Sequence, residues 1–163
     1  MKKLLITGII GFSLAVSCST VSKAKTAQEN RSEFLKMKGD WEITSIDYDN
    51  KKFKIKPFDE GADVQCFIGS HWRLIPNNFT GAYTLNGGGN CPSKTQPIKF
   101  EVVDGNTLMF KKIAEGTKAK QNENGYNLTL VNQSTDQFSL QQTVPFDGEQ
   151  INVIYNFQRT AMK

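Results

Sequence analysis

The sequence predicts an all-β domain, folded as an antiparallel up-and-down barrel of about eight strands. Apolar and polar residues alternate repeatedly from residue 41 onward, and turn sequences such as Asp104-Gly105-Asn106 separate the alternating stretches. Before them, helical patterning is limited to one short turn near Ser32–Lys38. Short links favour pairing between consecutive strands, and closure of the sheet removes its exposed edges. A β-sandwich is the alternative, because alternation alone does not separate the two architectures.

The first half of the domain contains the less regular strands. Trp41, Ile43 and Ser45 lie on one face of the first expected strand. Further strands are expected at Ala62–Phe67, His71–Ile75 and Thr80–Leu85. The glycine-rich stretch Asn86–Pro92 predicts a loop held in place by Cys91. It lacks the Gly-Lys-Ser/Thr ending of a phosphate-binding loop.

The second half alternates more cleanly, so that each expected strand has one apolar face. In a closed barrel these faces form the interior. They carry Ile98, Phe100 and Val102; Leu108 and Phe110; Tyr126, Leu128 and Leu130; Phe138 and Leu140; and Ile151, Val153, Tyr155 and Phe157.

Residues 1–17 are expected to be a secretory signal peptide. Two lysines precede the apolar run Leu4–Val16, which is about the length of a signal-peptide core and short for a membrane span. The stretch that ends in Ser17-Cys18 resembles the lipobox of bacterial lipoproteins, although leucine is usual where Ala15 stands. The resemblance implies cleavage before Cys18 and lipidation of its thiol. An ordinary cleaved signal peptide with an incidental cysteine is the alternative.

The next segment, residues 18–33, is expected to be a flexible tether between a lipid anchor at Cys18 and a domain at residues 34–163. From residue 19 to residue 33 it shows no apolar periodicity and contains no aromatic residue. Aspartate just after the cysteine retains lipoproteins in the inner membrane of some bacteria, and this sequence has serine there. The expected location is therefore the cell envelope, at the outer membrane.

Cysteine counting predicts one disulfide. Lipidation of Cys18 leaves Cys66 and Cys91 as the other two cysteines of an exported chain. An oxidising compartment favours their pairing, and no thiol is then left over. A Cys66–Cys91 bridge closes a loop of about 25 residues, worth about 3 kcal/mol in the chain-entropy model.

The triplet Gly39-Asp40-Trp41 begins the first strand after the predicted helical turn. It resembles the Gly-x-Trp signature of the lipocalins, and the chain is similar over most of Phe34–Thr160 to lipocalin-like lipoproteins of the bacterial envelope. The resemblance implies that Trp41 plugs the closed end of the barrel and that Arg159, near the end of the last strand, lies over its ring. The alternative is that Trp41 is an ordinary core aromatic residue and that Arg159 is an unrelated surface charge. A third family element, a Thr-Asp-Tyr turn, is echoed only by Thr135-Asp136 before Gln137 and is not carried over.

Neither catalysis, nor a metal site, nor a cofactor is expected. His71 is the sole histidine, and no Gly-x-Ser-x-Gly elbow accompanies it. Asp59, Glu60 and Asp63 form an acidic cluster without EF-hand spacing, which is more typical of an acidic turn than of a calcium site. The formal charge of +4 falls by two with the signal-peptide lysines, to +2, which is too small to indicate nucleic-acid binding.

Two functions from different classes follow. The first is a lipid-anchored binding module whose interior holds a small apolar molecule such as a fatty acid or another lipid, as the resemblance implies. The candidate ligand contacts are Phe100, Phe110, Phe138 and Tyr155. Residues nearest Trp41 should form the plug, which favours Phe100 and Phe138 over Phe157. The second is a non-enzymatic structural or protein-interaction module with a filled barrel. Large inward side chains leave both possibilities open, because eight strands have room for side chains or for one small ligand.

Overall fold

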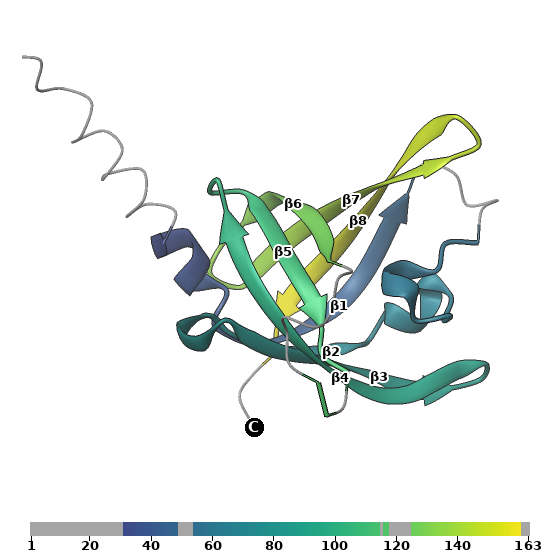
Figure 1. Cartoon of the computed structure of the whole chain (residues 1–163), viewed down its shortest axis with the longest axis horizontal. Helices are drawn as coiled ribbons and strands as arrows, with labels where there is room; N and C mark the ends of the chain where they lie inside the picture. The colour runs from purple at the N-terminus through teal and green to yellow at the C-terminus, as the bar shows by residue number, and fades with distance from the viewer. Residues whose placement is uncertain (1–30, 49–53, 115, 118–124, 161–163) are drawn as a thin grey trace, which may run out of the picture.

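Eight antiparallel strands follow one another around a closed barrel, and the last pairs with the first (Figure 1). The computed structural model describes residues 31–48, 54–114, 116–117 and 125–160. The strands are β1 (Gly39–Tyr48), β2 (His71–Ile75), β3 (Thr80–Gly88), β4 (Cys91–Val103), β5 (Thr107–Lys112), β6 (Tyr126–Gln133), β7 (Gln137–Phe146) and β8 (Glu149–Arg159). The predicted up-and-down barrel is confirmed, and closure rules out the sandwich.

A helix at residues 31–36 precedes the barrel, where the sequence predicts a helical turn. The signal peptide at 1–17, the lipidation site Cys18 and the tether up to residue 30 lie outside the described residues.

The alternating faces predicted for β4 to β8 point into the barrel. Their apolar side chains are buried, apart from Val102 and Leu130, which are partly buried against the core. The prediction for the first strand is wrong at Ser45, because a β-bulge shifts the register between Ile43 and Ser45. A bulge places an extra residue in one strand, so that the alternation resumes with Ile46 facing inward.

Two local expectations in the first half of the domain are also corrected. Val64–Phe67 forms a 3₁₀ helix, η2, where the sequence predicts a strand over Ala62–Phe67. Asp63 accepts a hydrogen bond from the Gln65 backbone N–H and so caps this helix. The glycine-rich stretch at 86–92 is the tip of the β3–β4 hairpin, since its glycines supply the positive φ angles that a tight turn requires.

The helix at residues 31–36 closes one end of the barrel. Its Phe34 ring lies 5.4 Å, between centroids, from that of Phe100 inside the barrel. Trp41 is 1% exposed, and its indole N–H donates to the Met37 carbonyl oxygen at 2.9 Å. The short peptide between helix and barrel is therefore fixed to the base of the core.

Arg159 lies over the indole ring of Trp41, with its guanidinium carbon 4.2 Å from the ring centroid. The two residues are partners in the β1–β8 register. The guanidinium also donates to the carbonyl oxygens of Lys36, Lys38 and Thr135 at 2.8 to 3.1 Å. One side chain thus ties together the last strand, the peptide before β1 and the β6–β7 turn.

The glycine of the Gly-x-Trp triplet has a specific steric role. Gly39 has a φ of +140°, and a Cβ at this position would lie 2.4 Å from a guanidinium nitrogen of Arg159. Only glycine tolerates both the backbone angle and the close approach. The triplet and Arg159 therefore form one packed unit.

The Cys66–Cys91 disulfide is present, with an S–S distance of 2.01 Å and a sequence separation of 25. It joins η2 to the start of β4. The segment between β1 and β2 is thereby anchored at its C-terminal part. Its neighbours reinforce the anchor, because Gly69 donates a backbone hydrogen bond to Ile43 and Phe67 is fully buried.

Trp41→Ala is expected to lower the free energy of unfolding by about 3–5 kcal/mol, because it empties a buried site. Arg159→Ala should cost less. The double variant should lose about 0.5–2 kcal/mol less than the sum of the single losses, since residues in contact couple. Urea unfolding of the four proteins measures this coupling. Lys111→Ala on the outer face of β5 is the control partner for Trp41→Ala, and a coupling for Arg159 no larger than that for Lys111 would contradict the contact.

Candidate functional site

The open end of the barrel, opposite Trp41, is filled by the connection between β1 and β2. Its residues 55–63, here called the lid segment, include the 3₁₀ helix η1 (Pro57–Asp59), and η2 follows directly. Figure 1 shows both helices between the end of β1 and the β3–β4 hairpin. Phe58 of the lid segment is 2% exposed.

The Phe58 ring lies among aromatic rings of the barrel interior, with centroids 5.0 to 6.2 Å away. These rings belong to Phe67, Trp72, Phe110, Tyr126 and Tyr155. Burial of a phenylalanine side chain stabilises by about 1.5–3 kcal/mol. A residue of a connection, and not of a strand, therefore fills the centre of the open end.

The backbone of Phe58 is strained. Its φ of 55° and ψ of 31° lie in the left-handed region, which costs about 1–2 kcal/mol for a residue other than glycine. Such a conformation persists only where its surroundings impose it. Here the imposing contacts are the burial of the ring and the polar contacts of Glu60, two residues further along.

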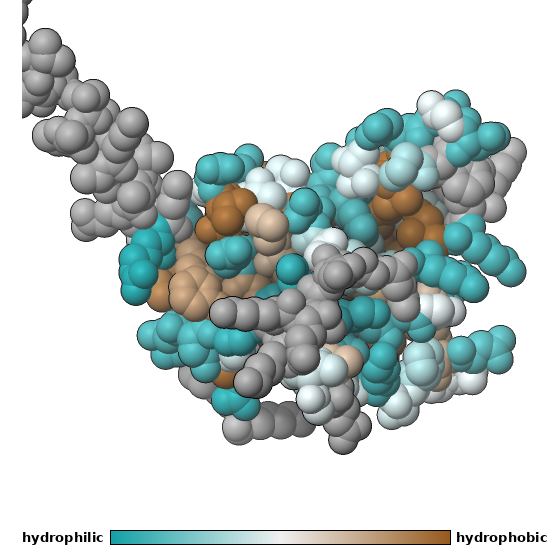
Figure 2. Space-filling view, viewed as in Figure 1, coloured by the Kyte–Doolittle hydropathy of each residue, from teal (hydrophilic) through white to brown (hydrophobic). Residues whose placement is uncertain are grey.

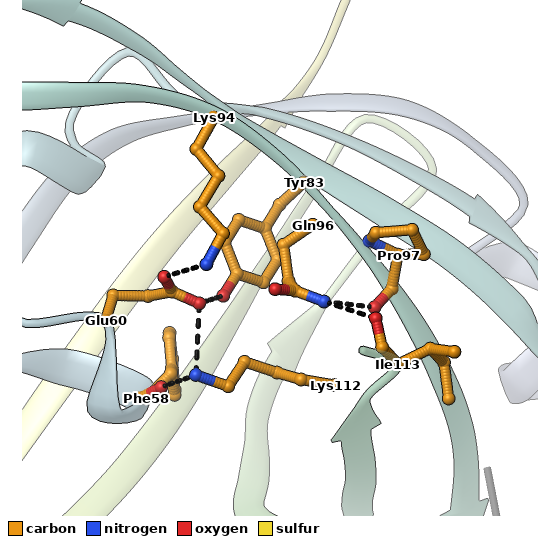
Figure 3. Close-up of polar contacts among 8 residues, drawn as sticks. All are labelled: Phe58, Glu60, Tyr83, Lys94, Gln96, Pro97, Lys112 and Ile113. Carbon is orange, nitrogen blue, oxygen red and sulfur yellow. Dashed lines mark hydrogen bonds and ion pairs between the residues drawn. The ribbon is translucent and has the colours of Figure 1, made fainter. Parts of the chain in front are cut away.

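The Glu60 carboxylate forms the second contact between the lid segment and the barrel (Figure 3). Its side chain is 2% exposed and lies 2.7 Å from the Lys94 ammonium and 3.1 Å from that of Lys112. The Tyr83 hydroxyl donates to the same carboxylate. Lys112 also donates to the Phe58 carbonyl oxygen at 2.7 Å. Donors from β3, β4 and β5 thus converge on one acidic side chain.

These contacts shift the pKa values of the acidic groups in opposite directions. Burial opposes ionisation of Glu60, but hydrogen bonds from Lys94, Tyr83 and Lys112 outweigh it and hold its pKa below the ordinary value of 4.5. Burial, followed by the hydrogen bond to Glu60, raises the pKa of Tyr83 far above its usual range. At neutral pH the phenol is therefore a donor and the carboxylate an acceptor.

Two of the four predicted ligand contacts line the space that Phe58 occupies. Phe110 and Tyr155 have ring centroids 5.0 and 5.3 Å from that of Phe58. The Tyr155 hydroxyl donates to the Gln142 side-chain oxygen at 2.9 Å, and burial raises the pKa of Tyr155. A molecule that replaced Phe58 would contact both rings.

The other two, Phe100 and Phe138, lie at the closed end. Phe100 contacts Phe34, and the Phe138 ring centroid is 4.6 Å from that of Trp41. Phe138 also stacks on Phe157 at 4.4 Å. Phe138 thus lies beside the Trp41 plug, whereas Phe110 and Tyr155 lie beside Phe58 at the open end.

The lid segment was not predicted from the sequence. Phe58 falls in an irregular stretch, and Glu60 fits an acidic turn. A signal was nevertheless available at the strand ends, because Lys112 shares the inward parity of Phe110, and Lys94 shares that of Ile98. Cations at inward positions require a partner, since burying an unpaired charge is costly.

Within the described ranges, no group of three or more His, Cys, Asp or Glu residues is placed to hold a metal ion. In the same part of the chain, none of the helices combines the length and apolar character needed to cross a membrane.

A separate groove of about 270 Å³ lies over β4, β5 and β6, with Phe79 and Met109 among its lining residues. Phe79 is 45% exposed. Figure 2 shows hydrophobic side chains on the viewed face next to the helix at residues 31–36, and again towards the β7–β8 hairpin. The groove is a second place where an apolar probe could bind, so tests of the open end must distinguish the two.

Comparison with known proteins gives only distant structural likeness. No protein-family model matches the sequence, and no curated protein matches it. One similar solved structure is a complex of bovine odorant binding protein with a selenium-containing odorant, at 14% identity and a TM-score of 0.45 over 80% of this chain and 74% of that one. Another is a deswapped triple mutant of bovine odorant binding protein, at 14% identity and a TM-score of 0.44 over 77% and 74% of the two chains. The barrel itself rests on the strand pairing of this chain.

The contacts of Glu60 predict a specific pH dependence. Because its pKa is lowered on folding, the stability it contributes is complete above the ordinary value of 4.5 and is lost as the pH falls through the lower folded value. At about pH 7, Glu60→Gln should lower the free energy of unfolding by about 1.5–3 kcal/mol, the range for hydrogen bonds to charged groups. The difference between the two proteins should shrink below about pH 4.5.

Denaturant unfolding between about pH 7 and pH 3 measures this difference. The control is Glu101→Gln, at an exposed position on the outer face of β4, which should change stability by no more than about 0.5 kcal/mol. A Glu60→Gln effect that is equal at both ends of the pH range would contradict the ion pairs.

Proposed function

We propose that this protein is a non-enzymatic binding protein of the cell envelope that holds a small, mainly apolar molecule in the open end of its barrel. The observation that carries the proposal is the position of Phe58. Side chains from the strands plug the closed end, but the centre of the open end is occupied by a side chain from a connection. Withdrawal of Phe58 breaks no strand pairing and leaves a space lined by aromatic rings.

The lining of that space fits a mainly apolar ligand. Trp72, Phe110 and Tyr126 provide ring faces and edges, and the Tyr155 hydroxyl is a polar group at the boundary. Binding sites for small molecules combine such apolar walls with a few oriented polar groups. The interior thus favours binding over catalysis.

A structural or protein-interaction module is the second candidate. It is favoured by the same residue, because Phe58 is 2% exposed and the barrel is filled with the lid segment in place. The two candidates differ in whether an external molecule can replace Phe58.

Envelope anchoring through Cys18 belongs to the same proposal. Its support is the sequence, in which an apolar signal segment ends at Ser17-Cys18, together with the Cys66–Cys91 disulfide. Disulfides persist in oxidising compartments, which agrees with export. The outer membrane is the proposed location, from the serine that follows Cys18.

Phe58→Ala is expected to increase affinity for an uncharged fluorescent probe such as N-phenyl-1-naphthylamine by about tenfold or more, because the probe no longer competes with the Phe58 ring. Fluorescence titration of the Cys18→Ser chain, with and without Phe58→Ala, measures the change. Phe157→Ala is the matched control: it removes a buried phenylalanine near the closed end and leaves the lid segment in place. No saturable binding to either protein would favour the structural module.

Lipidation is tested separately in the producing bacterium. Metabolic labelling with an alkyne fatty acid should label the wild-type chain and leave Cys18→Ser unlabelled and released from the membrane fraction. An unlabelled wild-type chain would overturn the anchor while leaving the binding proposal untouched.

A further inference from the structure

The lid segment presents an apolar ring and a carboxylate to the barrel together. Phe58 fills the aromatic space, and Glu60 reaches the donors at its edge. The backbone hydrogen bonds described within the segment are local, from Glu60 to Pro57 and from Val64 to Ile55. The contacts of Phe58 and Glu60 with the barrel therefore resemble those of a bound molecule more than those of a strand.

The polar half of this arrangement consists of three hydrogen-bond donors around Glu60. Two ammonium groups, from Lys94 and Lys112, and one phenol, from Tyr83, face a single carboxylate. The Tyr83 side chain is fully buried, whereas the lysine side chains are 44% and 23% exposed. If Glu60 moved away, the buried Tyr83 donor would lose its acceptor, and Lys94 and Lys112 would each lose an anionic contact, at the edge of an apolar space. Such a set favours an anion, because leaving a buried donor such as the Tyr83 hydroxyl without an acceptor is costly.

We infer that the ligand is an anionic amphiphile, with a carboxylate or similar head that replaces Glu60 and an apolar body that replaces Phe58. This inference rests on the proposed binding function and specifies its ligand class. The head accepts hydrogen bonds from Lys94, Lys112 and Tyr83. The body lies against Phe110 and Tyr155. The lid segment thus occupies its own binding site until the amphiphile displaces it.

Displacement is confined to the lid segment. The disulfide at Cys66 and the burial of Phe67 hold the chain that follows it. Release of Phe58 also relieves its left-handed backbone, which offsets part of the cost of opening. The apparent affinity equals the intrinsic affinity multiplied by the fraction of open molecules, so whatever weakens the lid strengthens binding.

The test compares an acid with its neutral ester. Parinaric acid, a fluorescent long-chain fatty acid, and its methyl ester are titrated into the Cys18→Ser chain near neutral pH. The acid should bind at least about tenfold more tightly, since a hydrogen bond to a charged group contributes about 1.5–3 kcal/mol. Lys112→Met and Lys94→Met weaken the lid as well as the contacts to the head, so each should tighten ester binding and reduce the preference for acid over ester by about tenfold.

Lys111→Met is the matched control, because it removes the neighbouring cation from the outer face of the same strand. Binding in the open end predicts that both affinities stay unchanged, whereas a change would place the probes in the groove beside Phe79, which Lys111 also lines. Hydrogen exchange at residues 55–63 should accelerate when the acid binds, which separates the open end from the groove beside Phe79. This readout and the acid–ester comparison need no lysine variant to fold.

Each outcome decides the inference. Equal binding of acid and ester would overturn it and leave the proposed function standing. Acid binding without faster exchange in the lid segment would place the ligand elsewhere and also overturn it. Failure of both probes to bind, with the Phe58→Ala chain also binding no uncharged probe, would overturn the inference and the proposed function together.

Discussion

Arg159 packs on Trp41 where the last strand pairs with the first and closes the sheet into a barrel. The two residues are register partners between β1 and β8, the first and last strands of the barrel. The guanidinium also fixes the peptide before β1 and the turn before β7 through three carbonyl oxygens. Removal of this side chain would free several elements at once. The absence of a side chain at Gly39 is part of the same constraint, because the guanidinium occupies the space that a Cβ would need.

Because the end beside Trp41 is closed, the opposite end determines whether the interior is filled by side chains or by a ligand. An eight-stranded barrel has an interior that side chains or one small ligand can fill. Strand residues and the helix at 31–36 fill the base, whereas the lid segment fills the opening. The disulfide anchors the connection just beyond the lid segment. The lid segment is therefore held by the chain that follows it but is not part of the sheet. Apolar contact and ion pairing hold it in place, and those are the two kinds of contact that an amphiphile can supply.

The sequence predicts the strands and the closed end of the barrel better than the segment that fills its open end. Period-two alternation identifies the inward residues of β4 to β8, because a strand in a barrel exposes alternate side chains to one interior. The contact between Trp41 and Arg159 was expected from the resemblance to the Gly-x-Trp signature, and parity only placed Arg159 on the inward face of its strand. Alternation fails at Ser45, where a bulge shifts the register, and at Val64–Phe67, where a capping aspartate starts a 3₁₀ helix. Such features depend on local hydrogen bonds that periodicity does not report.

The candidate site was hidden for a different reason. Glu60 meets Tyr83, Lys94 and Lys112 only after the sheet has closed, and local sequence around Glu60 gives no sign of these partners. The useful clue is an energetic conflict within the strands: Lys112 has the parity of a core residue, yet it carries a charge. A folded barrel resolves that conflict by bringing a carboxylate to it, and the carboxylate here comes from a segment whose own backbone is strained. In the proposed binding mode, the contacts that Glu60 makes when the barrel is empty are the same contacts that a bound ligand would make. Under the proposed function, stronger ion pairs at Glu60 would make the empty barrel more stable and would also make its site harder for a ligand to enter, so the moderate exposure of the two lysines suits a lid that opens.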